Sequence, residues 1–312
     1  MSTPEYLARR LLQLIPTLIA ILVIVFALVR LLPGDPASAI LGDRALDADV
    51  ERINREYGLD RPVPVQFGIF VRQVLTGDLG NSTSLKVPVA QLIAERLPIT
   101  MLLTLMAALI SVALAVPLAF VAALRRDRLA DSAIRGAFQV GLSMPVFYLG
   151  LILLTVFGAK LRWFPVGGSG DGFLDLLYHL VLPAVTLALS LAAVLMRNLR
   201  AAIIDVVDAD YVTFARSKGL RGGLILLRHV LRNALISTLA LFGLSIGTLL
   251  GGAVVTETVF AIPGAGRLMV DSITGRDYPV VQSLTLALAV LVSVTFLLTD
   301  LLQAWLDPRI AR

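Results

Sequence analysis

The sequence contains no cysteine, which excludes a disulfide framework, a thiolate metal site and a redox couple. Histidine is almost missing as well, since His179 and His229 are the only two in 312 residues. The chain also lacks the G-x-x-x-x-G-K-S/T phosphate-binding loop, so it does not bind ATP in that way. Any activity driven by ATP therefore needs a partner that carries the nucleotide site.

Charge is scarce where the chain is most apolar. Hydrophobic residues make up 57% and charged residues 16% of the sequence, and the mean hydropathy is +0.87, far from a soluble profile. Six windows without Asp, Glu, Lys or Arg are long enough to cross the ~30 Å of a bilayer core: residues 11–29, 97–124, 136–159, 176–196, 233–256 and 278–299. Proton- or ion-coupled carriers and voltage sensors need buried ionisable groups. The absence of such groups from the six windows argues against both classes.

The first window is interpreted as an anchor. Arg9 and Arg10 precede it as in a signal peptide, but its 19 apolar residues exceed a typical signal core. Residues 31–35 offer no small-residue cleavage site. The sequence therefore predicts an all-α membrane protein with six transmembrane helices.

Basic residues predict the orientation. With the N-terminus inside, the cytoplasmic segments hold 15 of the 27 cations and 8 of the 22 acids, a net +7 against −2 outside. The short loop at residues 125–128 carries most weight. Both termini are thus expected in the cytoplasm of a multi-pass protein of the cell membrane, and the formal charge of +5 reflects topology rather than nucleic-acid binding.

A charged, glycine-punctuated segment at residues 205–233 separates two apolar windows. Asp210 can cap a helix N-terminus, Lys218 suits its last turn, and Gly219 follows where a left-handed residue ends a helix. This helix would have about two turns, and a helix that short is only marginally stable in water on its own. The apolar face of Tyr211, Phe214 and Ala215 therefore predicts that this helix docks into another protein.

The same segment resembles the "EAA" loop of membrane subunits of ABC importers. ARSKGL at residues 215–220 and LRHVLRNAL at 227–235 are similar to the dipeptide/oligopeptide/nickel branch. Phe214 departs from the small residue usual there, and the proline that often closes the motif is replaced near Arg232. The resemblance implies a helix that docks in a cleft of the ATPase subunit and couples hydrolysis to membrane motion, with these residues: Asp210, Tyr211, Phe214, Ala215, Lys218, Gly219 and Arg228.

Further stretches resemble the same permeases. They are RLLPGDP at residues 30–36, ETVFAIPGAGRL at 257–268, GRDYPVVQ at 275–282, and DLL at 300–302 with LDPRI at 306–310. Together with the long first loop they resemble the B-type subunit of a B/C permease pair. The implied fold is the transmembrane domain of a type I ABC importer. The implied partners are a second homologous permease in a heterodimer, two ATPases that bind ATP and Mg, a solute-binding protein outside the cell, and membrane lipid.

One stretch of the sequence fits both a catalytic motif and a helix-packing motif. Gly243-Leu244-Ser245-Ile246-Gly247 fits the G-x-S-x-G nucleophile motif, which needs a preceding strand, a base and an acid. Here it lies within an apolar window. Gly243, Gly247 and Gly251 repeat every four residues and instead predict a small-residue stripe for close helix approach.

Two segments are predicted to lie outside, and the first is too long for a plain connector. Residues 33–96 predict a small extracytoplasmic subdomain with helices at 47–57 and 65–75, either receiving a binding protein or covering helix ends. In residues 256–279, Pro263-Gly264 predicts a turn and 267–274 a short helix with Leu268, Met269 and Ile273 on one side. This second segment is expected to roof an outer mouth, or to be a surface loop, with these residues at the mouth: Glu257, Pro263, Gly264 and Asp277.

The chain is accordingly divided into residues 1–32, 33–96 and 97–312, with the coupling loop at 205–233. Kinks are possible at Pro98, Pro117, Pro145 and Pro183. The resemblance implies peptides as solutes, with glutathione, nickel chelates or haem as alternatives. An ion-coupled carrier or channel, and an intramembrane hydrolase at Ser245, are the alternatives of other classes.

Overall fold

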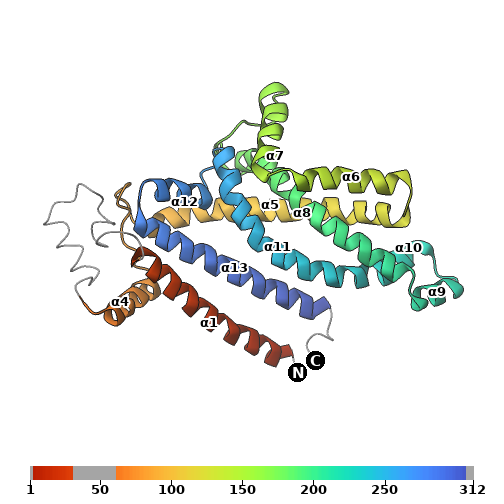
Figure 1. The fold of residues 1–312 in the computed structure, drawn as a ribbon, viewed down its shortest axis with the longest axis horizontal. Helices are drawn as coiled ribbons and strands as arrows, with labels where there is room; N and C mark the ends of the chain where they lie inside the picture. The colour runs from red at the N-terminus through yellow and green to blue at the C-terminus, as the bar shows by residue number, and fades with distance from the viewer. Residues whose placement is uncertain (1–2, 31–60, 307–312) are drawn as a thin grey trace. The chain divides into compact units, whose positions relative to one another are not determined.

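The computed structural model describes residues 3–30 and 61–306, where every regular element is helical apart from one backbone bridge between Asn81 and Pro88 (Figure 1). The predicted helix at 47–57 and the motifs at 30–36 and 306–310 lie largely or wholly outside these residues. Two segments, η1 and η2, are π-helical. The elements are α1 (Thr3–Arg30), α4 (Val63–Thr76), α5 (Val89–Leu124), α6 (Leu129–Ser143), α7 (Val146–Leu153), η1 (Leu154–Lys160), α8 (Phe173–Val207), α9 (Asp210–Ser217), α10 (Gly222–Leu224), η2 (Ile225–Leu231), α11 (Arg232–Val259), α12 (Ala265–Thr274) and α13 (Tyr278–Leu306).

All six apolar windows fall on helices. Within the described residues, α5, α8, α11 and α13 each contain a stretch long and apolar enough to cross a membrane. The pair formed by α6 and α7–η1 gives a fifth span if it is counted as one. In α1 the apolar stretch Leu12–Ala27 is shorter. The predicted six spans thus correspond to four complete helices, one broken pair and one shorter apolar helix.

The window at residues 136–159 is not the single straight span that the sequence predicts. Its two halves meet at an angle of 107°. Pro145 has no N–H to donate, and a proline disfavours the helical conformation in the residue before it. Met144 is accordingly extended, with φ −89° and ψ 133°. Pro98, Pro117 and Pro183, in contrast, lie within helices that continue through them.

The described residues form two compact units, each with its own core. Unit 1 is built on Met101–Ile262 with the end of α13, and α8 lies at its centre. α8 packs against α6, α7, α11 and η2. Ala184, Ala188 and Ala192 are fully buried at four-residue intervals, which lets neighbouring helices approach closely.

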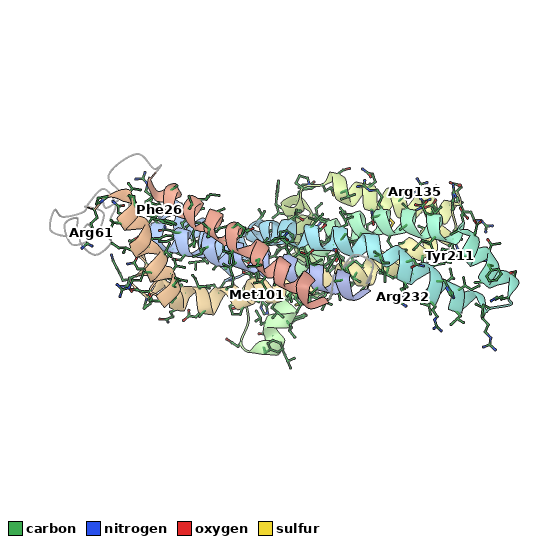
Figure 2. The ribbon with its side chains drawn as sticks, turned by 90° about the horizontal axis from the view of Figure 1, so that it is seen from below. Phe26, Arg61, Met101, Arg135, Tyr211 and Arg232 are labelled. Atoms are coloured by element: carbon green, nitrogen blue, oxygen red, sulfur yellow. The ribbon has the colours of Figure 1, made fainter. Side chains whose placement is uncertain are left out.

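Unit 2 combines residues 61–100 and α1 from Leu7 with residues 263–294. Its core joins α5, α12 and α13 through Val89, Leu92, Ala265, Leu268, Val280 and Leu284. The ring of Phe26 in α1, labelled in Figure 2, meets that of Phe67 in α4 edge to face, with their centroids 5.2 Å apart. The helix predicted at residues 65–75 is confirmed as α4, and Gly77 ends it at φ +75°. Two segments that are far apart in the sequence, and that are both predicted to lie outside the cell, therefore share one core.

Within this chain, the predicted glycine stripe of α11 makes a close contact at Gly243 but none at Gly251. A Cβ built on Gly243 would overlap the Thr299 side chain of α13, whose own Cβ would be 2.8 Å away. The same addition at Gly251 meets nothing within 4 Å, whereas at Gly252 it would lie 3.0 Å from Leu187 of α8. A helix turns once in 3.6 residues, so each four-residue step drifts by about 40°. Gly251 has therefore rotated away from the contact, and the packing of Gly247 stays a prediction.

Gly243→Ala should lower the melting temperature of the purified chain in detergent, because overpacking at a close contact costs about 1–3 kcal/mol. Gly251→Ala should keep or raise it, since alanine favours a helix over glycine by about 1 kcal/mol. Combining Gly243→Ala with Thr299→Gly should recover part of the loss. Equal melting temperatures for the two alanine variants would show that α11 and α13 are not in close contact at Gly243.

Candidate functional site

α9 follows α8 after a two-residue turn. Asp208 keeps a near-helical φ of −86°, and Ala209 is extended at ψ 144°. Ala209, rather than Asp210, is the residue that flanks the helix, and no side chain caps it. The capping role predicted for Asp210 is therefore wrong, because Ala209 already holds the extended conformation of a cap. Asp210 is the first helical residue, where its carboxylate still favours the positive end of the helix dipole.

The end of α9 agrees with the sequence within one residue. The helix ends at Ser217, and Lys218 follows it instead of lying in its last turn. Gly219 has φ +76°, which confirms the predicted left-handed conformation. Its N–H donates to the carbonyl of Arg216 at 2.9 Å. A side chain at this position would cost roughly 1–2 kcal/mol.

α9 has two apolar faces rather than one. Val212 and Ala215 are buried, and α9 packs against η2 of its own chain. Tyr211 and Phe214 are 44% and 61% exposed. The prediction of one face containing Ala215 is wrong, because apolar residues at 211, 212, 214 and 215 cover more than one side of a two-turn helix. Of these four apolar residues, only Tyr211 and Phe214 are exposed and available to another protein.

We define the coupling surface as Tyr211, Phe214 and Lys218. The Lys218 ammonium lies 4.6 Å from the centre of the Phe214 ring, a cation–π contact worth about 0.5–1 kcal/mol when exposed. The Tyr211 hydroxyl accepts a hydrogen bond of 3.0 Å from the Asn233 amide, which ties α9 to the start of α11. Tyr211 and Arg232 lie at one end of unit 1 (Figure 2).

Further exposed cations lie on the segments that carry or follow this aromatic pair. Arg216, Arg221 and Arg228 are all exposed, on α9, on the turn after it and on η2. Two exposed rings within a basic rim fit a protein surface that offers an apolar cleft with acidic edges.

The chain beyond Gly219 is helical where the sequence suggested a loop. α10, η2 and α11 follow one another without a break from Gly222 to Val259. The sequence did not predict this helix at its start, because Gly222 and Gly223 lie there and glycine is a poor helix former. η2 carries Arg228 and widens the helix by a π turn, a feature that is frequent at functional sites.

The second predicted site, at the outer mouth, is held by one buried carboxylate. Asp277 is 1% exposed and accepts hydrogen bonds from the Ser82 hydroxyl and from the N–H groups of Thr83 and Ser84. This clamp fixes the turn at 82–86 to the start of α13, although it spans more than 190 residues of sequence. Nothing in the sequence pairs these positions.

Pro263, Gly264 and Asp277 border one cleft of about 440 Å³ in unit 2. The Pro263 carbonyl accepts a 3.2 Å hydrogen bond from Arg96, a residue that the sequence analysis missed. Glu257 is fully buried in unit 1. The helix predicted at 267–274 is confirmed as α12.

One contact predicted for α12 is wrong. Leu268 and Met269 pack on the core of unit 2, whereas Ile273 is 58% exposed. Ile273 lies five residues from Leu268, which is about 140° round the helix, so the two cannot share one narrow face.

Comparison with known proteins identifies the family. The chain matches the model of the binding-protein-dependent transport system inner membrane component over residues 115–312, and that of its N-terminal region over 4–104. The chain belongs to this family. The predicted resemblance to ABC-importer permeases is confirmed.

Several full-length relatives are transport permeases. The chain is 42% identical to the glutathione transport system permease protein GsiC of Pectobacterium atrosepticum, over 98% of both chains. It is 39% identical to the oligopeptide permease AppB of Bacillus subtilis and 38% to the di/tripeptide permease DppB of Pseudomonas aeruginosa, again over 98% of both chains.

The fold matches a solved importer. An inward-facing structure of the MetNI methionine ABC transporter aligns with a TM-score of 0.59 at 15% identity, covering 70% of this chain and 97% of that one. The permease therefore has the transmembrane fold of a type I ABC importer.

In this permease, the G-x-S-x-G motif lacks the structure that catalysis requires. Ser245 lies in the middle of α11, and its hydroxyl donates to the Leu241 carbonyl at 2.8 Å. A nucleophile elbow needs a strand followed by a sharp turn. The motif is part of a helix, and its first glycine packs against Thr299.

Proposed function

We propose that this permease forms the translocation path together with a second, homologous permease, and that its α9 docks in a cleft of an ATPase subunit. The observation that carries the proposal is the coupling surface: two exposed rings on a short helix that is anchored on its opposite face. Two ATPases bind ATP and Mg²⁺, and α9 transmits their closure to α8. A solute-binding protein delivers the cargo on the other side.

We propose peptides as the cargo. The relatives named above are permeases for glutathione, oligopeptides and di- or tripeptides, and glutathione is itself a tripeptide. Full-length identity of about 40% supports the class without selecting a peptide length. A nickel chelate or haem is the alternative solute.

The proposed orientation places both termini and α9 in the cytoplasm. The net charge of +7 supports it when all the segments placed in the cytoplasm are counted, the loop after residue 124 included. The predicted site residues of unit 2, Pro263, Gly264 and Asp277, then lie outside, together with the turn at 82–86. In this orientation the cleft beside them faces the binding protein.

Single cysteines should test the orientation directly, because the chain has none of its own. Ser84 and Thr274 are exposed and should react in intact cells with a maleimide that does not cross membranes. Ser217 is exposed on α9 and should react only after the cells are opened. Reaction of Ser217→Cys in intact cells would show that the topology is the inverse of the one proposed.

Gly219→Val should uncouple the transporter. The side chain strains the left-handed turn or redirects the end of α9, and a cost of 1–2 kcal/mol corresponds to a roughly 5- to 30-fold change in an equilibrium. The complex should assemble, yet its ATPase activity should no longer respond to peptide-loaded binding protein. Tyr211→Ala should act in the same direction through lost burial.

Gly222→Val is the matched control, because Gly222 has open space around it and a φ outside the left-handed region. It should keep the response. A wild-type response of ATPase activity in the Gly219→Val complex would contradict the proposed role of α9.

A further inference from the structure

Asp131, in the first turn of α6, is a fully buried carboxylate. A buried charge is unfavourable unless it is paired and hydrogen-bonded. Arg200 of α8 supplies both, since its Nε and Nη2 donate to the two carboxylate oxygens at 2.7 and 2.6 Å. This planar two-bond geometry fixes direction as well as charge. Arg135 adds a contact of 3.2 Å from the partly exposed side of α6.

The same carboxylate also holds the loop before α6. The N–H of Asp127 donates to Asp131 at 3.1 Å, and Asp127 itself is left-handed at φ +62°, which is uncommon for a residue other than glycine. Arg126 in this loop lies 3.7 Å from the carboxylate of Asp208, at the end of α8. Both side chains of that pair are exposed, so it contributes little energy. It does place the loop beside the turn that leads to α9.

The ion pair therefore joins α6 to α8, and α8 is the helix that leads into α9. Arg200 lies seven residues before Val207, about 10 Å along the helix from the start of the turn into α9. Asp131 lies in the first turn of α6, and this helix ends at the break at Met144-Pro145. Figure 2 shows Arg135 of α6 and Tyr211 of α9 at the same end of unit 1.

We propose that Asp131 and Arg200 are positioning residues that make α6 move with α8, so that a displacement of α9 reaches the broken span of α6 and α7–η1. This inference rests on the proposed function of α9. A packed apolar contact allows helices to slide, whereas a bidentate ion pair between the buried Asp131 and the half-buried Arg200 holds one register. The link does not touch the solute or the nucleotide.

The test replaces the link without leaving a buried charge. Apolar replacement of both partners of a buried pair is often neutral or stabilising, whereas removal of one is not. The variant Asp131→Leu with Arg200→Met should therefore assemble with its ATPases at an unchanged melting temperature. Spin labels on exposed cysteines at Val140 of α6 and Leu244 of α11 report the movement of α6, and a label at Ser217 reports docking of α9.

In the complete wild-type complex, the non-hydrolysable ATP analogue AMP-PNP should change the distance between positions 140 and 244. In the double variant that change should be lost, while the label at 217 stays immobilised by the ATPase. Arg135→Ala is the control: it removes an exposed partner, keeps the Arg200 link, and should retain the wild-type change.

Each other outcome is decisive. A label at 217 that remains mobile in the wild-type complex overturns the proposed function of α9. An immobile label at 217 with a distance change retained in the double variant, or absent in the wild type, overturns only the inference about α6. If the double variant does not assemble, Arg200→Lys decides: it keeps the charge but loses the planar fork. Its distance change should then be smaller than that of the wild type, and an unchanged response would overturn the inference.

Discussion

The burial of α8 is the constraint on which unit 1 depends. Four other elements pack on this helix, and its fully buried alanines set how closely they approach. Helices in hydrocarbon gain little from apolar burial alone, so close packing and satisfied polar contacts must hold them together. Because α9 continues from α8 after two residues, the position of the coupling surface follows from this packing.

Backbone hydrogen bonding limits where the helices of this permease can change direction. A peptide group without a partner is costly in a membrane, so breaks are tolerated where the surrounding protein packs on them. The break at Met144-Pro145 turns the chain by 107° into α7, which packs on α8 and α11. Gly150 lets α7 come close to Phe260 and Thr186, since an added Cβ would lie 3.2 and 3.3 Å from their side chains. The bend between α6 and α7 is therefore held by the packing of unit 1.

Features that depend on local sequence were predictable. Apolar windows without charge located the five longest helices and the bent pair of α6 and α7–η1, and glycines located the ends of α4 and α9. The sharp bend at Pro145 was not predictable, because Pro98, Pro117 and Pro183 also lie in apolar windows and yet stay within helices that continue through them. A proline permits a bend, and tertiary packing decides whether one forms.

The missed contacts share one physical cause: their partners are distant in the sequence. Asp131 and Arg200 are 69 residues apart, and Asp277 and Ser82 are 195 apart. No periodicity relates such positions. Likewise, the apolar residues of α9 do not reveal which face packs on its own chain, so Ala215 was assigned to the wrong side. Tyr211 and Phe214 could be proposed from the sequence because two aromatic residues three apart on a short helix are a local pattern, and both are exposed. Their role in docking stays a prediction.

The most direct measurement of the central claim is a photo-cross-link from the coupling surface. A photoreactive phenylalanine at position 214 and, as a control, at position 173 would be equally available, because the two side chains are 61% and 65% exposed. In the assembled complex, position 214 should cross-link to an ATPase subunit and position 173 should not. A complex in which position 214 never reaches an ATPase subunit, or reaches it no more than position 173 does, would contradict the account.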